Sequence, residues 1–138
     1  MGKIVLDTDV FIEIFNKNLE VFNFIEEIVR LENIVTTSIT VAELIISANN
    51  KETQKKIEQY LSDVNIISLN RNADKVFSSL IKKYHLSHNI QIADCLIAAI
   101  CLVNDFTLFT FNKKHFQFIP NLKLINHNIK PLKLPFKS

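Results

Sequence analysis

Glycine is almost missing from this chain: Gly2 is the only one among its 138 residues. The P-loop and the dinucleotide fingerprint need several glycines, because their backbones turn sharply and approach the phosphates closely. The sequence therefore excludes nucleotide binding by either of these glycine-rich loops.

Cysteine is scarce as well. The only two, Cys95 and Cys101, lie six residues apart in one predicted helix, so they form neither a C-x-x-C motif nor a disulfide framework. This pattern predicts a reduced, cytoplasmic protein. His85 and His88 alone do not make a zinc site, and we expect both on the surface.

Long apolar runs are missing too. None reaches the roughly 20 residues that a membrane-spanning helix requires, so no membrane association is expected. The run at residues 3–6 is too short for the core of a signal peptide, and Asp7 interrupts it.

Acidic residues are absent after Asp105, whereas lysines continue to the end of the chain. The overall net charge is +2, so residues 1–112 carry about −4 once the last six lysines are set apart. A basic edge beside an acidic site suits a polyanionic substrate that needs metal ions, but on charge alone a solvated tail without a partner is the favoured explanation. These lysines are Lys113, Lys114, Lys123, Lys130, Lys133 and Lys137.

Apolar periodicity predicts strands that alternate with helices, in one domain over residues 1–138. This alternation is typical of an α/β fold with a parallel sheet and helices on both faces. An irregular basic tail is predicted from about residue 127, where prolines appear. The strands are predicted at 4–6, 34–36, 64–69, 107–109 and 122–125, and the helices at 10–15, 19–31, 40–48, 51–62, 72–84, 92–103 and 113–118.

Two aspartates, Asp7 and Asp9, follow the first predicted strand. The carboxyl ends of parallel strands are where such sheets bind their ligands. An unpaired buried carboxylate is costly, so each needs water, a partner or a metal. One of them could instead cap the following helix, but a single cap does not explain both.

Three further polar residues have structural explanations of their own. Glu43 could close a capping box with Thr40, and Asp94 could interact with a helix dipole. Asn112 is expected to cap the helix that follows it. Glu43 and Asp94 begin predicted helices, while Asn112, like Asp7, follows a strand, so all of them could meet at one sheet edge. Clustered carboxylates without a His/Cys set favour Mg²⁺ or Mn²⁺.

Four segments in this order resemble PIN-domain ribonucleases, and more narrowly the VapC-type toxins of prokaryotic toxin–antitoxin pairs. They are Leu-Asp-Thr-Asp ending at Asp9, Ser-Ile-Thr-Val-Ala-Glu-Leu around Glu43, Ile-Ala-Asp-Cys-Leu-Ile-Ala-Ala around Asp94, and Leu-Phe-Thr-Phe-Asn-Lys-Lys-His-Phe around Asn112. The resemblance extends over residues 3 to about 125. It implies a three-layer fold with a small parallel sheet flanked by helices.

The resemblance also implies a metal-dependent endoribonuclease that binds Mg²⁺ or Mn²⁺ and cleaves RNA. Asp7, Glu43 and Asp94 would form its acidic core. A homodimer and a small antitoxin protein are the implied partners. Apolar residues of the first helices could contact them, although burial in the core is the simpler expectation for each: Phe11, Phe15 and Phe22.

The chain departs from the family at the fourth acid, because it has Asn112 and His115 at positions where members often carry Asp. Asp9 could supply the missing charge as a further metal ligand. The expected catalytic residues are Asp7, Glu43, Asp94 and Asn112, and the expected substrate-binding residues are Thr110, Lys113, Lys114 and His115.

Two alternatives remain open at this stage. A haloacid-dehalogenase-like phosphatase would use Asp7 as nucleophile and Asp9 as acid/base, but it gives no role to Glu43 or Asp94. A degenerate, non-catalytic PIN binding module would explain the weakened fourth acid.

Overall fold

The computed structural model describes residues 2–136, so Lys137 of the predicted basic tail lies outside the description. Its centre is one five-stranded sheet in the order β3-β2-β1-β4-β5, and every neighbouring pair is parallel. The predicted α/β class is confirmed. The strands are β1 (Ile4–Leu6), β2 (Ile34–Thr37), β3 (Asn65–Ile67), β4 (Thr107–Phe109) and β5 (Lys123–Leu124).

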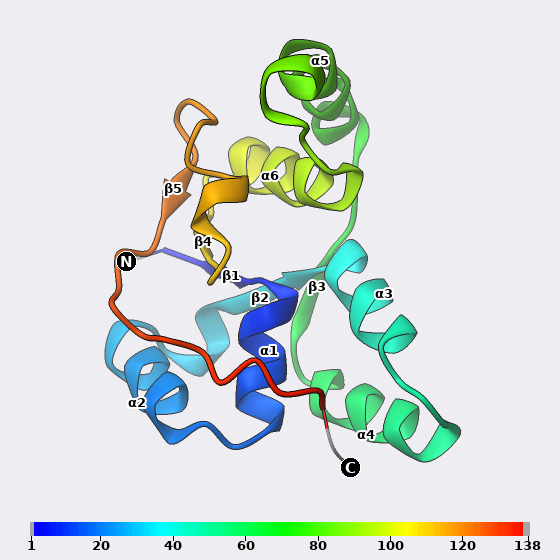
Figure 1. Ribbon diagram of the computed structural model, residues 1–138, viewed down its shortest axis with the longest axis vertical. Helices are drawn as coiled ribbons and strands as arrows, with labels where there is room; N and C mark the ends of the chain where they lie inside the picture. Colours follow the sequence, from blue (N-terminus) through cyan, green and yellow to red (C-terminus); the bar gives the residue numbers. More distant parts are fainter. Residues whose placement is uncertain (1, 137–138) are drawn as a thin grey trace.

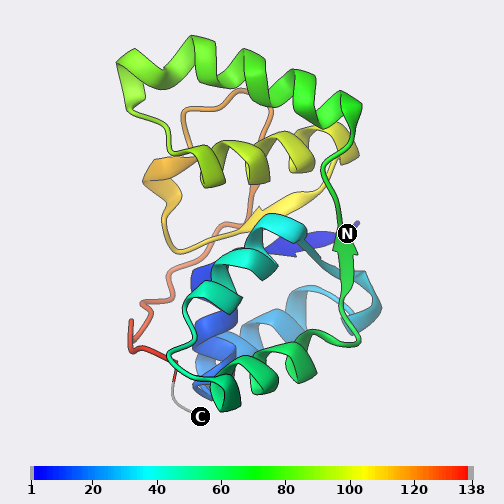
Figure 2. The same cartoon turned by 90° about the vertical axis from the view of Figure 1, so that its right-hand side faces the viewer.

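Helices connect these strands and cover both faces of the sheet (Figures 1 and 2). No helix within residues 2–136 is long and apolar enough to cross a membrane. The helices are α1 (Thr8–Phe15), α2 (Leu19–Ile28), α3 (Ser38–Ile46), α4 (Lys51–Leu61), α5 (Arg71–His88) and α6 (Ile92–Asn104), with 3-10 turns η1 (Leu31–Asn33) and η2 (Lys113–His115).

The three layers follow from the two-residue period of the central strand. Ile4 and Leu6 point into a core shared with α1, α2 and α4, whereas Val5 points into a second core shared with α5 and α6. Figure 2 shows α5 and α6 stacked on one side of the sheet and α1, α2 and α4 on the other. Helix α6 is buried along most of its length, as its continuous apolar sequence predicts.

Two predicted helices are shorter than expected. The segment predicted at 19–31 ends at Ile28, because Val29 adopts an extended conformation (φ −154°, ψ 147°) as the chain turns toward β2. The segment predicted at 113–118 is a single 3-10 turn, Lys113–His115. Burial of Phe116 and Ile119 holds the residues after this turn against the α5–α6 side of the core.

The start of α3 corrects the predicted capping box. The helix begins at Ser38, and its cap is Thr37, whose hydroxyl accepts a hydrogen bond from the Thr40 backbone N–H at 3.0 Å. Thr40 is therefore inside the helix, with its amide satisfied by Thr37. Because β2 runs directly into α3, the last strand residue becomes the cap, and Glu43 is left free to point elsewhere.

The order of the strands creates the crevice in which the polar residues meet. From the central β1 the chain moves to β2 on one side and later returns to β4 on the other side. Open α/β sheets bind ligands at such a change of direction, beyond the carboxyl ends of the strands. Here β1 and β4 end beside the beginnings of α1 and η2, which carry the residues described next.

Candidate active site

Asp7 lies at the end of β1 and is also the N-cap of α1. Its backbone N–H donates to the carbonyl of Phe109 in β4 at 3.0 Å. One carboxylate oxygen, Oδ1, accepts from the Thr8 N–H, and the other, Oδ2, accepts from the Thr110 hydroxyl, both at 2.8 Å. Only 5% of the residue is exposed. The carboxylate of Asp7 therefore both caps α1 and belongs to the polar cluster at the sheet edge.

Asp9 faces the end of β4 from the first turn of α1. Its Oδ2 accepts from the Phe111 N–H at 3.2 Å and from the Asn112 side-chain amide at 3.0 Å. Its Oδ1 is buried and has no hydrogen-bond partner. Asn112 occupies the N-cap position of η2, but its side chain makes no cap hydrogen bond, so the predicted side-chain cap is wrong. Its N–H₂ group instead donates to the Asp9 carboxylate, which makes a charge-assisted hydrogen bond.

Glu43 extends from α3 toward α1. Its Oε1 accepts a hydrogen bond from the Thr8 hydroxyl at 2.8 Å. Thr8 was not among the predicted site residues, although its position between two aspartates was a usable signal. The residue links the second acidic segment to the first.

Asp94 lies in the first turn of α6 and pairs with His115 of η2. Their Oδ2 and Nδ1 atoms are 2.9 Å apart, and the Asp94 side chain is 18% exposed against 52% for His115. The cap residue Gln91 makes no side-chain bond to the helix. The sequence predicts that His115 binds substrate. In the structure its ring contacts Asp94, an acidic residue of the site.

The four carboxylates lie close enough to influence one another. Burial is the main cause that raises the pKa of each of Asp7, Asp9, Glu43 and Asp94, and it brings the pKa of Asp9 to about 7. Repulsion raises these pKa values further, because each group has at least one of the other carboxylates as a neighbour. The convergence predicted from the sequence is therefore present, and a bound cation would relieve the repulsion.

The donor set fits a hydrated hard cation. Within residues 2–136, no three His, Cys, Asp or Glu side chains form a ready-made metal cage. Mg²⁺ does not require one, because it commonly binds through one or two carboxylates and keeps several waters. The unpartnered Oδ1 of Asp9 is a free oxygen donor at this place. These residues thus suit Mg²⁺ or Mn²⁺ held partly through water.

Two hollows flank the acidic residues. One, of about 280 Å³, lies between η2 and the α5–α6 connection and is lined by Asp94, Lys114 and His115, among others. The other, of about 450 Å³, begins at Asp9 and Asn112. Lys113, also expected to bind substrate, is exposed at the start of η2.

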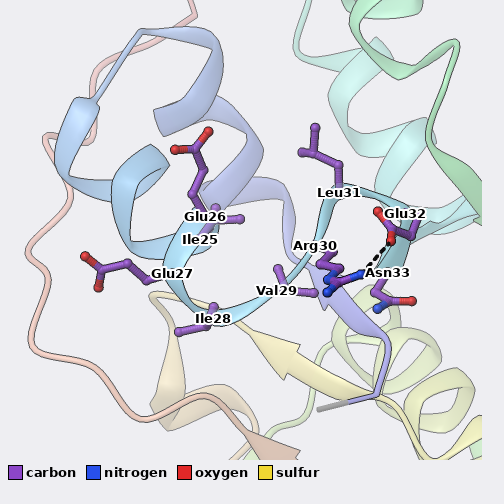
Figure 3. Close-up of a pocket in the computed structure, with 9 residues that line it drawn as sticks. All are labelled: Ile25, Glu26, Glu27, Ile28, Val29, Arg30, Leu31, Glu32 and Asn33. Atoms are coloured by element: carbon purple, nitrogen blue, oxygen red, sulfur yellow. Dashed lines mark ion pairs between the residues drawn. The ribbon is translucent and has the colours of Figure 1, made fainter.

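A third hollow, of about 650 Å³, is separate from these residues. It is lined only by residues 25–33, where α2 gives way to η1 (Figure 3). Arg30 and Glu32 point toward one another there at 4.0 Å, but both are largely exposed, so the pair contributes little to stability. None of the predicted site residues lines it.

The sequence matches the PIN domain family over residues 4–120. The chain belongs to the PIN-domain family. This PIN domain is 30% identical over 130 residues to ribonuclease VapC2 of Rickettsia felis, a match that covers 88% of this chain and 96% of that protein. It is also similar to the crystal structure of VapBC2 from Rickettsia felis bound to a promoter DNA fragment, with a TM-score of 0.75, 29% identity and coverage of 91% and 98% of the two chains.

The PIN fold is shared with a more distant structure, VapBC-1 from nontypeable Haemophilus influenzae. The TM-score is 0.74 at 24% identity, over 89% of this chain and 96% of that one. The predicted family and three-layer architecture are confirmed.

Proposed function

We propose that this PIN domain is a metal-dependent endoribonuclease that cleaves RNA phosphodiester bonds as the toxin of a toxin–antitoxin pair. The observation that carries the proposal is the convergence of four mutually repelling carboxylates at one edge of a PIN-family sheet. The relative VapC2 is a ribonuclease, which supports the choice of RNA as substrate.

Asp7 and Asp94 are the main metal ligands in this proposal, with Asp9 as a further ligand. A bound Mg²⁺ or Mn²⁺ would supply Lewis-acid activation of water and stabilise charge that develops on the phosphate. Glu43 binds the metal or orients the water that attacks. Thr8 and Thr110 hold Glu43 and Asp7 in position through their hydroxyl groups.

Asn112 acts through Asp9, which its amide orients at 3.0 Å. This contact gives the residue a role although it replaces an acid common in the family. His115, at the other position of departure, pairs with Asp94 at 2.9 Å and so helps to orient that carboxylate. Lys113 and Lys114 lie next to it in η2, where they can hold the RNA backbone together with Thr110.

The two alternatives are less well supported. A phosphatase that uses Asp7 and Asp9 alone leaves unexplained why Glu43 and Asp94 raise the pKa values of their acidic neighbours. A non-catalytic binding module would retain the fold and the partner contacts but would show no metal-dependent cleavage.

A small antitoxin protein and a second copy of the chain are the proposed partners. The similar structures include toxin–antitoxin complexes such as VapBC2, which supports the antitoxin. Phe11 and Phe15 are buried, whereas Phe22 is 41% exposed beside the more exposed Leu31, so only part of the expected apolar contact surface is accessible. Light scattering of the purified chain measures the dimer, and a monomer at high concentration would contradict it.

The buried free thiols Cys95 and Cys101 suit the proposed cytoplasmic location.

The test of the proposed function is RNA cleavage by wild-type protein and the Asp7→Asn variant, each with Mn²⁺ and with EDTA. We expect cleavage only by the wild type with Mn²⁺. The loss in the variant should exceed the roughly 10–100-fold that follows removal of a residue that merely supports a metal ligand. The fold should survive, because Asn can still accept from the Thr8 N–H. Full Mn²⁺-dependent activity in Asp7→Asn would refute the assignment.

A further inference from the structure

The tail after β5 is attached to α1 through a buried acid. Glu13 is 2% exposed, yet its carboxylate accepts from the backbone N–H of Leu132 at 2.8 Å and of Lys133 at 3.1 Å. The Asn18 side-chain amide donates to it at 2.7 Å. Glutamate is rarely buried without partners, so the position of Glu13 depends on the tail being in place.

Further contacts hold the end of the tail. The Asn16 side-chain amide donates to the carbonyls of Leu134 and Pro135 at 3.1 and 3.2 Å. The ring of Phe136 lies 5.2 Å from that of Phe15, centroid to centroid. Figure 1 shows the tail crossing α1 on its way toward α4. It lies beyond residues 4–120, the part of the chain that matches the PIN family.

The tail forms one wall of the 450 Å³ hollow that begins at the acidic site. On one side the hollow is lined by Asp9, Phe111 and Asn112. On the other side the tail contributes Pro131, Lys133, Leu134 and Pro135. A cation and several apolar groups therefore stand directly beside the residues proposed to bind metal.

We propose that this pocket, defined by Asp9, Phe111, Asn112 and residues 131–135, binds one nucleotide of the RNA strand next to the scissile phosphate. Lys133 contacts its phosphate, and the ring of Phe111 with the proline rings forms the apolar surface for its ribose and base. The volume is within the range of small-ligand sites. This inference rests on the proposed ribonuclease function, because it assigns a part of the same substrate.

The cation that lines the pocket suits a phosphate group. The charged lining residues are Asp9, Glu13 and Lys133. Asp9 is assigned to the metal and the carboxylate of Glu13 is occupied by the tail backbone, so Lys133 is the charged group left for a ligand. Asp9 and Asn112 belong both to the acidic site and to the pocket lining. An RNA strand with its scissile phosphate at the acidic residues would therefore continue directly into the pocket.

Binding of a short fluorescent single-stranded RNA, measured by anisotropy in EDTA at several salt concentrations, tests the pocket without depending on cleavage. Lys133→Ala should weaken binding about fivefold, a typical loss for one charge-assisted contact. The slope of log K against log salt should fall by about 0.7, as expected for one lost phosphate contact with a single strand. The matched control is Lys130→Ala, which removes a tail lysine that does not line the pocket and should change neither quantity.

Glu13→Gln tests whether the tail positions Lys133. Gln keeps one oxygen for the Leu132 N–H but presents an N–H₂ group to the Lys133 N–H, so the bond that positions Lys133 is lost and two donors face each other. RNA binding should weaken as much as in Lys133→Ala, and the double variant should be no weaker than either single one. A merely structural effect of Glu13 would instead add to that of Lys133.

The outcomes separate this inference from the proposed function. RNA binding that depends on Lys133, in a protein without Mn²⁺-dependent cleavage, would support the pocket and refute the nuclease. Cleavage by the wild type, with unchanged affinity and salt slope in Lys133→Ala, would refute nucleotide binding in the pocket. The pocket would then serve a protein partner or only the packing of the tail. Absence of any RNA binding would refute it as well.

Discussion

At the scale of single residues, the acidic site consists of carboxylates that each have at least one polar partner from another segment. Asp7 pairs with Thr110, Glu43 with Thr8, and Asp94 with His115. These partners fix the directions of the carboxylates before any metal binds, which reduces the ordering cost of binding. Their hydrogen bonds lower the pKa values of these carboxylates, against burial and repulsion, which raise them.

Glu43→Gln separates charge from hydrogen bonding at one of these residues. Gln can still accept the bond from the Thr8 hydroxyl, so the fold should persist. The site loses one negative charge, so metal affinity and RNA cleavage should fall by about tenfold or more, while the melting temperature of the metal-free protein stays level or rises.

The measurements are metal titration, cleavage rate and thermal unfolding on this one variant. Glu27→Gln, an exposed position on α2, is the matched control and should change none of them. Unchanged cleavage in Glu43→Gln would leave Asp7, Asp9 and Asp94 as the candidate ligands.

At the scale of secondary-structure elements, helix beginnings place the acids. Asp7 caps α1, Asp9 lies in the first turn of the same helix, and Asp94 lies in the first turn of α6. The positive end of a helix dipole stabilises a negative charge there by about 0.3–1 kcal/mol. The ends of β1 and β4 lie at the same edge of the sheet as these helix beginnings. The positive ends of the helix dipoles and the acidic side chains therefore lie together there.

Thr37→Val tests the cap that fixes the start of α3. The change removes the hydroxyl that accepts from the Thr40 N–H but nearly preserves side-chain volume. We expect the free energy of unfolding to drop by about 1–2 kcal/mol in urea titrations. Cleavage should drop too, because Glu43 is on this helix.

Thr40→Val is the comparison for this experiment. It removes only the 3.0 Å contact between the two hydroxyls and leaves the cap in place, so it should cost less. A larger loss in Thr40→Val than in Thr37→Val would restore Thr40 as the cap.

At the scale of the whole molecule, two separate cores hold one charged crevice between them. The α1–α2–α4 side supplies Asp9, and the α5–α6 side supplies Asp94, while the sheet carries Asp7 between the two. The tail adds a further connection across α1, away from the sheet. The predicted extent of one domain over residues 1–138 stays a prediction.

The pH dependence of stability reports on this crevice. The pKa of Asp9 is raised to about 7 from its usual 3.8, so between these values the folded state holds a proton that the unfolded state releases. The contribution of Asp9 to the free energy of unfolding is therefore fully present below about pH 4 and is lost as the pH rises through 7. The melting temperature of the metal-free protein should fall from pH 5 to pH 8, less steeply in Asp9→Asn.

Added Mn²⁺ should oppose this loss. Metal ligands must be deprotonated, so Mn²⁺ should raise the melting temperature more at pH 8 than at pH 5. A stabilisation by Mn²⁺ that is equal at both pH values, or absent in the wild type, would contradict metal binding by these acids.

The sequence by itself determined the class of fold and the identity of the acids. Strand and helix periods are local properties, so they predicted the alternating elements, with Asp7 after a strand and Asp94 at a helix start. Asp7 and Asp94 were recognisable because each adjoins an apolar segment, where a carboxylate needs a compensating partner.

The tertiary structure alone decided what each polar group contacts. Asn112 bonds to Asp9 and Glu43 to Thr8, across 103 and 35 residues of chain, whereas local patterns favoured caps for both. Glu13 was unremarkable in the sequence, yet it holds a tail 119 residues away. Such bonds depend on which segments the sheet order and the packing of the helices bring together, and no local spacing encodes that proximity.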